Sequence, residues 1–375
     1  MPLSIAARFL QENFMTSSPR VSLSANNSLT RRSMLMGGAG LAALPLAAWA
    51  QGVPDLKGAT VVFASFGGAY QDAERASYCD PFEKATGARV LQDGPMNVAK
   101  FRAMIESGSP DWDVADVVGG FLEAGIKDGL FEKIDARLVN TGRIDPRFVN
   151  DYGVGCIVWS YNLAFNTASF DSGAEPKTWA NLFDLKKFPG KRTLLDQPVS
   201  SLEIALLADG VAPDRLYPLD VERAFKKLDI IKEQTIFWAT NSQSQQLFVD
   251  REVSVGVILN GRAYDAVQKG AKIGISWEQN IQAVDYLVVP RGSRNRDAAM
   301  RLIDTMTLPE NQAKLANLIA YSPTNAAAFN SIDPKIEPWL CTSFENIKRG
   351  FVISQVFWRD NLTKLTERWT SWKLS

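Results

Sequence analysis

The sequence contains no histidine among its 375 residues, and this absence limits the chemistry that the chain can perform. It excludes a serine or cysteine nucleophile activated by an imidazole, and every metal site that needs a histidine ligand. Carboxylates and lysines remain available as acids and bases, but we find no pair whose spacing indicates catalysis. Catalysis by these groups remains possible, but we expect no catalytic residue and no metal site.

The cysteines add little reactive chemistry. Cys79, Cys156 and Cys341 are far apart in the sequence and form no CxxC pair, so their spacing does not predict a zinc site. Two of them could form a disulfide in an oxidising compartment, or all three could be small buried apolar residues. The sequence leaves both alternatives open.

Two glycine-rich turns follow predicted buried strands. Ala59–Gly68 reads ATVVFASFGG and Asp113–Gly120 reads DVADVVGG, and each is an apolar run that ends in a glycine pair. In parallel sheets, ligands bind beyond the carboxyl ends of the strands. The segments Ser65–Gly68 and Val118–Gly120 are therefore candidate binding loops.

The elements that must position these loops are strands that alternate with helices, a pattern typical of a parallel sheet with helices on both faces. Two long extended runs, residues 156–166 and 283–290, divide the chain. We expect an α/β fold of two lobes, each a sheet flanked by helices, which are joined by two crossing strands and separated by a cleft. The predicted division is residues 51–158 with 286–330 for the first lobe, 159–285 for the second lobe, and 331–375 for a helical tail packed on the lobes.

Six segments occur in an order that is found in one protein family. The segments are FGGAYQDAERASYCDPFEKATGARV, DVVGGFLEAGIKDGLFEKID, WSYNLAFN, TWANLFDLKKFPGKRTLLD, GVILNGRAY and YLVVPRGSRNRDAAMRLIDTM. The chain resembles extracellular (periplasmic) solute-binding proteins of ABC importers over residues 58–325, and the spermidine/putrescine-binding branch most closely. The resemblance implies a type II-like periplasmic-binding-protein fold that closes over a small polar solute and delivers it to a permease in the inner membrane. It implies neither catalysis nor a prosthetic group.

The resemblance also implies binding residues. In the polyamine-binding branch, carboxylates meet the ammonium groups of the solute and aromatic rings flank its methylene chain. Asp285, in AVDYLVVP, matches the acid of the second crossing strand, although it could instead be held by nearby backbone amides. Trp238 and Tyr264 are candidate aromatic walls, although such residues more often belong to the core. The residues that match the two binding loops of the family are Ser65, Gly67, Gly68, Tyr70, Gly119 and Gly120.

The chain departs from this family pattern at two acids. LNGR, residues 259–262, replaces the family turn WxGD, so Arg262 follows Asn260 and Gly261 where an acid binds an amine. The acid expected after the strand of the second lobe is also missing, with Asp196 as the nearest substitute. We hypothesise a ligand that offers a carboxylate to Arg262, because arginine binds carboxylates with two parallel hydrogen bonds, and an amine to Asp285.

An alternative for Arg262 remains open at this point. Its guanidinium could pair internally with Asp265, Asp285 or Asp196, and the site would then accept a monoamine or a neutral solute. In either case Asn260, Arg262 and Asp196 are candidate binding residues.

The N-terminal segment predicts export. LTRRSMLMGGAGLAALPLAAWAQG, residues 29–52, has two arginines, then an uncharged stretch too short for a membrane span, then Ala-Trp-Ala. This pattern resembles a twin-arginine signal peptide over residues 1–50, cut after Ala50, and places the mature protein in the periplasm. The true start, Met1 or Met15, remains open.

The charge balance bears on the expected partners. The 41 basic and 41 acidic residues give a net charge of zero, so nothing indicates a nucleic acid partner. We expect a monomer whose partners are a small solute and a permease. Two alternatives remain: an enzyme on the same scaffold, and a sensor that presents the solute to a membrane receptor.

Overall fold

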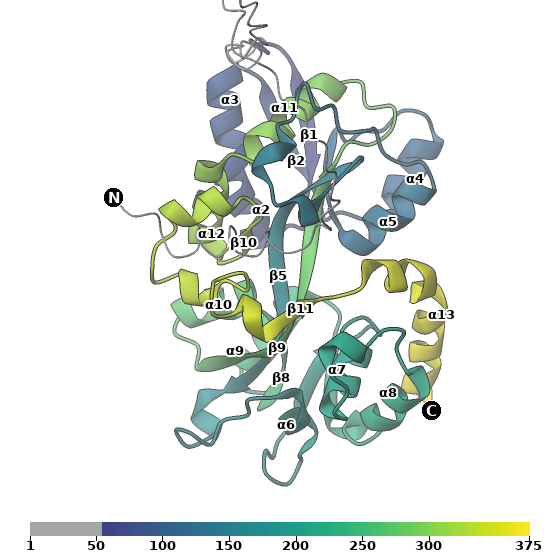
Figure 1. Ribbon diagram of the computed structural model, residues 1–375, viewed down its shortest axis with the longest axis vertical. Helices are drawn as coiled ribbons and strands as arrows, with labels where there is room; N and C mark the ends of the chain where they lie inside the picture. The colour runs from purple at the N-terminus through teal and green to yellow at the C-terminus, as the bar shows by residue number, and fades with distance from the viewer. Residues whose placement is uncertain (1–54) are drawn as a thin grey trace, which may run out of the picture. The chain divides into compact units, whose positions relative to one another are not determined.

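One mixed sheet of eleven strands organises the computed structural model, which describes residues 55–375. The main strands follow the order β2-β1-β3-β9-β5-β8-β6-β7, with helices on both faces (Figure 1). They are β1 Thr60–Ala64, β2 Arg89–Asp93, β3 Val114–Val118, β5 Gly153–Asn166, β6 Arg192–Leu195, β7 Thr235–Trp238, β8 Val255–Leu259 and β9 Ile273–Val288. Three short strands pair beside this path: β4 Val149–Asn150, β10 Ser322–Pro323 and β11 Gly350–Val352. The predicted export signal lies outside the described residues.

The two halves of the sheet form the two lobes that the sequence predicts. β2, β1 and β3 are parallel at one end, β8, β6 and β7 are parallel at the other, and the antiparallel strands β5 and β9 run through both. The helices of the first lobe are α2 Gly68–Glu74, α3 Asp80–Thr86, α4 Val98–Glu106, α5 Gly119–Lys127, α11 Arg296–Met306 and α12 Pro309–Ile319. Those of the second lobe are α6 Trp179–Phe183, α7 Ser201–Ala208, α8 Val221–Leu228, α9 Asn241–Val249 and α10 Asn260–Gln268. The residue bounds of the lobes stay a prediction.

The second crossing strand is longer than the sequence predicts. β9 begins at Ile273, whereas the predicted run begins only at Ala283. The first half of the strand could not be recognised in the sequence, because the polar residues of SWEQNIQ break the alternation of apolar and polar side chains. Gln279 has a φ of +57°, and the pairing with β5 shifts register between Tyr161 and Leu163. β5, in contrast, is buried at every position, as expected for a strand covered on both faces.

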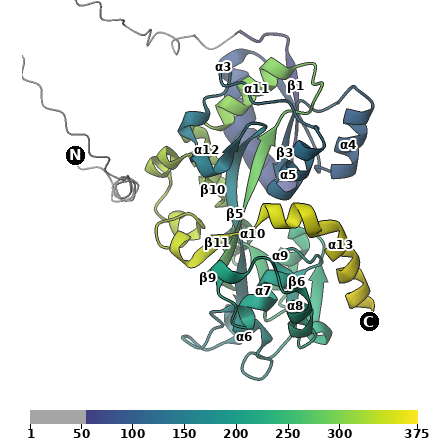
Figure 2. The same cartoon turned by 45° about the vertical axis from the view of Figure 1, so that its right-hand side comes forward.

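The C-terminal tail contains one long helix, α13 Gln355–Leu374, which begins later than the predicted start near Phe344. A 3₁₀ turn, Ile347–Arg349, and strand β11 precede it, and β11 pairs in parallel with β9. Both views place α13 beside the second lobe, with its first turn near α5 (Figure 2). No helix within residues 55–375 is long and apolar enough to cross a membrane.

The cysteines behave as small buried residues. Cys79, Cys156 and Cys341 are free thiols in the structure, and all three are buried. Burial raises the pKa of Cys79 and that of Cys341 to about 12. The structure therefore favours the second of the two alternatives that the sequence leaves open.

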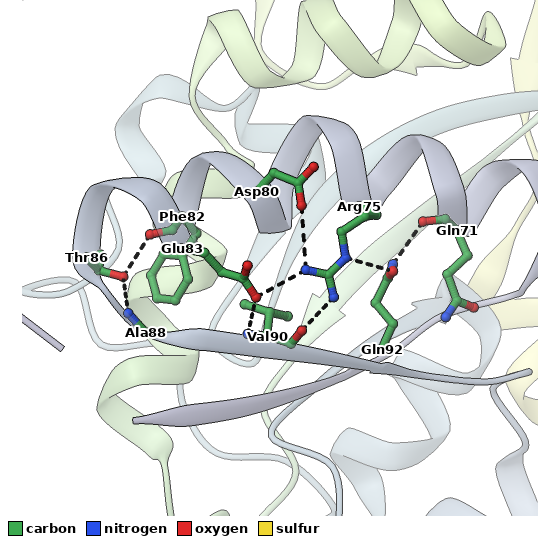
Figure 3. A network of polar contacts seen from close by, with 9 residues as sticks. All are labelled: Gln71, Arg75, Asp80, Phe82, Glu83, Thr86, Ala88, Val90 and Gln92. Atoms are coloured by element: carbon green, nitrogen blue, oxygen red, sulfur yellow. Dashed lines mark hydrogen bonds and ion pairs between the residues drawn. The ribbon is translucent and has the colours of Figure 1, made fainter. Parts of the chain in front are cut away.

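A polar network ties the helical segment of residues 68–86 to the edge strand β2 (Figure 3). Arg75 donates from Nε to Gln92 Oε1 at 3.2 Å and from Nη2 to the carbonyl oxygen of Val90 at 2.5 Å. Its Nη1 lies 3.2 Å from Glu83 Oε1, which also accepts the Val90 amide at 2.6 Å. One half-buried guanidinium thus joins helix to strand. The helical segment ends at Gly87 with a φ of +73°, which confirms the predicted glycine stop.

We expect Arg75→Ala to lower the free energy of unfolding by about 2 kcal/mol, because several hydrogen bonds to a charged group are lost together. Urea unfolding followed by circular dichroism measures the change. Arg137→Ala is the matched control, because Arg137 is exposed and pairs with Asp135 two residues away, and it should leave the stability nearly unchanged. Equal effects of the two substitutions would contradict the role of the Arg75 network.

Candidate functional site

Arg262 carries a buried positive charge with no carboxylate partner. It lies in the first turn of α10, directly after β8, so the end of that strand positions it. The side chain is only 8% exposed, and its Nε is buried without a hydrogen-bond partner. Within residues 55–375 no acid lies within ion-pairing distance of the guanidinium, whereas most other arginines of the chain are paired. Burying an uncompensated charge is costly, so an anion beside this guanidinium would be stabilised.

The three acids considered as internal partners of Arg262 are engaged elsewhere. Asp265 binds Lys269 Nζ at 2.9 Å and Gln245 Nε2 at 2.7 Å. Asp196 binds Lys373 Nζ of α13 at 2.6 Å. Asp285 accepts a hydrogen bond from the indole of Trp159. None of the three forms the internal ion pair that the sequence leaves open.

Asp285 supplies a buried carboxyl group. It lies near the end of β9, opposite Val118 of β3, and is 5% exposed. Its Oδ1 accepts the Trp159 indole N–H at 2.9 Å, rather than the backbone amides of the alternative interpretation. Burial raises the pKa of Asp285 well above its ordinary value, and the nearby Asp116 carboxylate raises it further. An ammonium group would relieve both effects.

Tyr321, which the sequence analysis missed, connects the two charges. Its ring packs so tightly on α10 that a Cβ at Gly261 would lie 2.4 Å from Tyr321 Cε1. On the other side it contacts Tyr70 edge-to-face at 5.5 Å. Burial raises the pKa of Tyr321, the Arg262 guanidinium lowers it, and the Asp285 carboxylate raises it. The Tyr321 hydroxyl is thus close enough to Arg262 and to Asp285 for both to affect its pKa.

Two of the predicted loop residues contact a buried pair of acids. The Ser65 hydroxyl donates to Glu74, and the Tyr70 hydroxyl donates to Asp116 Oδ2 at 2.7 Å. Burial raises the pKa of Asp116 to about 7, although Tyr70 lowers it, and burial also raises that of Glu74. Ser65 and Tyr70 therefore hold these acids behind Asp285, and direct ligand contact by either residue stays a prediction.

The glycine pairs have local explanations. Gly67 and Gly68 have φ values of +79° and +62°, and a Cβ at either would meet open space. The left-handed backbone of this turn accounts for both glycines, while the open space leaves room for a ligand. At the other pair, a Cβ on Gly119 would lie 2.7 Å from Gln355 Cδ, so the first turn of α13 covers this loop. The binding role of all four glycines stays a prediction.

The remaining candidates serve contacts within the protein. Asn260 accepts the Ser160 amide at 3.0 Å and donates to the Ala320 and Trp339 carbonyls at 2.8 and 3.0 Å. Tyr264 contacts the Trp339 ring edge-to-face at 5.6 Å. Trp369 and Lys373 occupy the carboxylate of Asp196. Trp238 is buried at the end of β7, and its indole N–H has no partner within the described chain.

A hollow of about 440 Å³ elsewhere on the molecule lacks a comparable unpaired charge. It is lined by residues of the first lobe, among them Leu308, Pro309 and Arg143. Arg143 is already paired with Asp304 at 2.8 Å. The Arg262–Asp285 pair therefore remains the better candidate for capturing a charged solute.

Comparisons with known proteins identify the family. Residues 77–339 match the family model described as bacterial extracellular solute-binding protein. A gamma-aminobutyric acid-binding protein of Pseudomonas aeruginosa is 32% identical over 316 residues, which cover 82% of this chain and 89% of that protein. The spermidine/putrescine-binding periplasmic protein of Escherichia coli is 26% identical over 290 residues, which cover 72% and 81%.

A solved structure agrees with both matches. The Atu4243–GABA receptor superposes with a TM-score of 0.79 and 42% identity, over 84% of this chain and 97% of that one. The expected two-lobed fold and the expected role, capture of a small solute for an ABC transporter, are thereby confirmed. The chain belongs to the family of bacterial extracellular solute-binding proteins.

Proposed function

We propose that this protein captures a small zwitterion of the 4-aminobutyrate type in the periplasm. Arg262 binds the carboxylate of the solute, and Asp285 binds its ammonium group. The observation that carries this proposal is the buried Arg262 guanidinium, whose Nε has no partner and which has no carboxylate within ion-pairing distance among the described residues. A ligand carboxylate supplies the missing counter-charge through hydrogen bonds that are stronger than those between neutral groups.

The amine end of the site has matching chemistry. Asp285 is buried, and the Trp159 indole is its one hydrogen-bond donor within residues 55–375. The ring of Trp159 contacts Tyr161 edge-to-face at 5.0 Å, so aromatic surface lies beside the carboxylate. Such surface suits a methylene chain with a cation at its end. Tyr321 closes the site between the two charges.

The relatives support a zwitterion over a polyamine. The relatives at 32% and 42% identity are named for gamma-aminobutyric acid, whereas the spermidine/putrescine-binding relative is 26% identical. A diamine would place its second ammonium group against Arg262, and like charges in a buried site repel. The charge pattern therefore favours one cationic and one anionic group on the solute.

We extend the proposal to the maturation, the oligomeric state and the partners of the protein. The mature protein begins after Ala50, once a twin-arginine-type signal is removed, and it works as a monomer that docks on a permease of the inner membrane. It binds rather than transforms its solute, and it uses no cofactor, no metal ion and no nucleic acid. Mass spectrometry of the molecule that co-purifies with the mature protein tests the solute class directly.

We expect Arg262→Ala to weaken binding of 4-aminobutyrate at least about 30-fold, because the removed guanidinium is the sole counter-charge of a desolvated carboxylate. Isothermal titration calorimetry at constant ionic strength measures the change. Arg223→Ala is the matched control, since Arg223 pairs with Asp209 at the surface of the same lobe and should leave affinity unchanged. If putrescine bound tightly to the native protein and Arg262→Ala did not alter that affinity, the carboxylate assignment would be wrong.

We expect the affinity for 4-aminobutyrate to rise with pH between about pH 6 and pH 8, where both charges of the ligand are constant. The raised pKa of Asp285 means that the empty site holds a proton, which an incoming ammonium must displace. Affinity therefore grows as the pH approaches that raised pKa, and it levels off above it. Calorimetry across this range measures the slope.

The variant Asp285→Asn tests the origin of this slope. It should bind weakly at every pH and lose most of the pH dependence, because the titrating group is gone. Asp116 and Glu74 also titrate nearby, so Asp116→Asn should leave a reduced slope of the same sign. An undiminished slope in Asp285→Asn would remove Asp285 from this role.

A further inference from the structure

Helix α13 is fixed along most of its length to the second lobe. Near its end, Trp369 Nε1 and Lys373 Nζ bind Asp196 at 3.0 and 2.6 Å. Trp372 Nε1 binds Asp229 at 2.7 Å, and its carbonyl accepts Lys232 Nζ at 2.6 Å. The rings of Trp369 and Trp372 also pack on those of Phe225 and Phe237. This aromatic and ionic anchor makes the end of α13 part of the second lobe.

The first turns of α13 are held to the second lobe as well. Trp358 Nε1 donates to Glu203 Oε1 of α7 at 2.7 Å, and the same oxygen accepts the Tyr217 hydroxyl at 2.7 Å. Glu203 is fully buried, and burial raises its pKa to about 7. The indole on this acid keeps the start of α13 on the second lobe too.

The same turns also contact the first lobe, and their backbone lies close to that of α5. Arg359 Nη1 lies 3.6 Å from Glu123 Oε2 of α5, and both side chains are about one-third exposed. Gln355 lies over Gly119 at the start of α5. Both views show the start of α13 beneath α5 (Figures 1 and 2). We call these contacts, of Gln355 and Arg359 with Gly119 and Glu123, the α13–α5 latch.

The opposite side of the molecule joins the lobes through more deeply buried hydrogen bonds. There, Asn260 of the second lobe donates to the carbonyl oxygens of Ala320 and Trp339, and these hydrogen bonds are buried or partly buried. Tyr321 packs against Gly261 so closely that no side chain fits between them. In Figure 1 this side, with α10 and α12, lies across the crossing strands from α13. A rotation that opens the lobes costs least when it separates the more exposed α13–α5 latch and keeps these buried hydrogen bonds.

We propose that the α13–α5 latch stabilises the closed state and so sets ligand affinity. α13 moves with the second lobe, the lobes turn about the crossing strands and the Asn260–Tyr321 side, and the latch forms only when they close. This inference rests on the solute-capture function, but it does not depend on which solute binds. Because a protein with a smaller closed fraction binds its ligand more weakly, the latch adjusts affinity without contacting the ligand.

The test uses charge reversal in the mature protein, with two readouts. Glu123→Lys places a cation opposite Arg359, and Glu123→Lys combined with Arg359→Glu restores an opposite pair. Glu222→Lys is the matched control. Glu222 of α8 pairs at 3.1 Å with Arg368, which lies on α13 as Arg359 does, and this pair is entirely within the second lobe. The readouts are calorimetric affinity for 4-aminobutyrate and interlobe fluorescence energy transfer without ligand, with labels at the exposed Lys84→Cys and Lys186→Cys positions.

We expect Glu123→Lys to lower the closed fraction and weaken binding about 3- to 10-fold, an effect that shrinks at high salt. Arg359→Glu alone should also weaken binding, and the double variant should recover at least half of that lost affinity. The recovery is partial because Arg359 also pairs with its neighbour Asp360, and this pair is not restored. Glu222→Lys should change neither readout. An unchanged interlobe distance distribution in Glu123→Lys, or an equal change in Glu222→Lys, would overturn the latch.

The two readouts separate this inference from the choice of solute. If no variant binds 4-aminobutyrate but Glu123→Lys opens the empty lobes and the double variant closes them, the latch is supported and the proposed solute is wrong. If binding is tight and indifferent to Glu123 while the distances also stay fixed, the solute stands and the latch is wrong.

Discussion

The central physical constraint in this molecule is that a buried charge needs a counter-charge. Arg262 and Asp285 are each less than one-tenth exposed, and neither has an ionic partner in the described part of the chain. A folded protein tolerates such charges at a cost, and a site that leaves them unpaired without ligand gains most when a ligand completes them. Under the proposed function, this cost in the empty protein makes the site selective for a solute with complementary charges.

The rest of the fold keeps the two charges apart. Arg262 is held at the end of β8, and Asp285 at the end of β9 where it pairs with β3. Two acids considered as partners of Arg262 are bound by other cations: Asp265 binds Lys269, and Asp196 binds Lys373 of the tail helix. Tyr321 packs against Tyr70, whose hydroxyl binds Asp116. The tail helix thus binds an acid that the sequence offers as a partner for Arg262.

Much of the architecture could be predicted from the sequence, because strands and helices alternate with clear glycine stops such as Gly87. The start of β9 could not, since its first half is polar and breaks the alternation at Gln279. Asp285 and Arg262 were visible as a charge in an apolar run and as a departure from a family motif. Tyr321 carried no such signal, because only tertiary packing on Gly261 brings it to the site. The contacts that Asn260 and Tyr264 make within the protein could not be predicted either, because both residues contact Trp339, which is distant in the sequence.

The most direct measurement is a calorimetric comparison of three four-carbon ligands on the unmodified mature protein. 4-Aminobutyrate offers an ammonium and a carboxylate, butylamine offers only the cation, and putrescine offers two cations. If Arg262 and Asp285 act as an opposed pair, 4-aminobutyrate binds at least about 30-fold more tightly than either of the others. Putrescine binding as tightly as 4-aminobutyrate would contradict a carboxylate at Arg262.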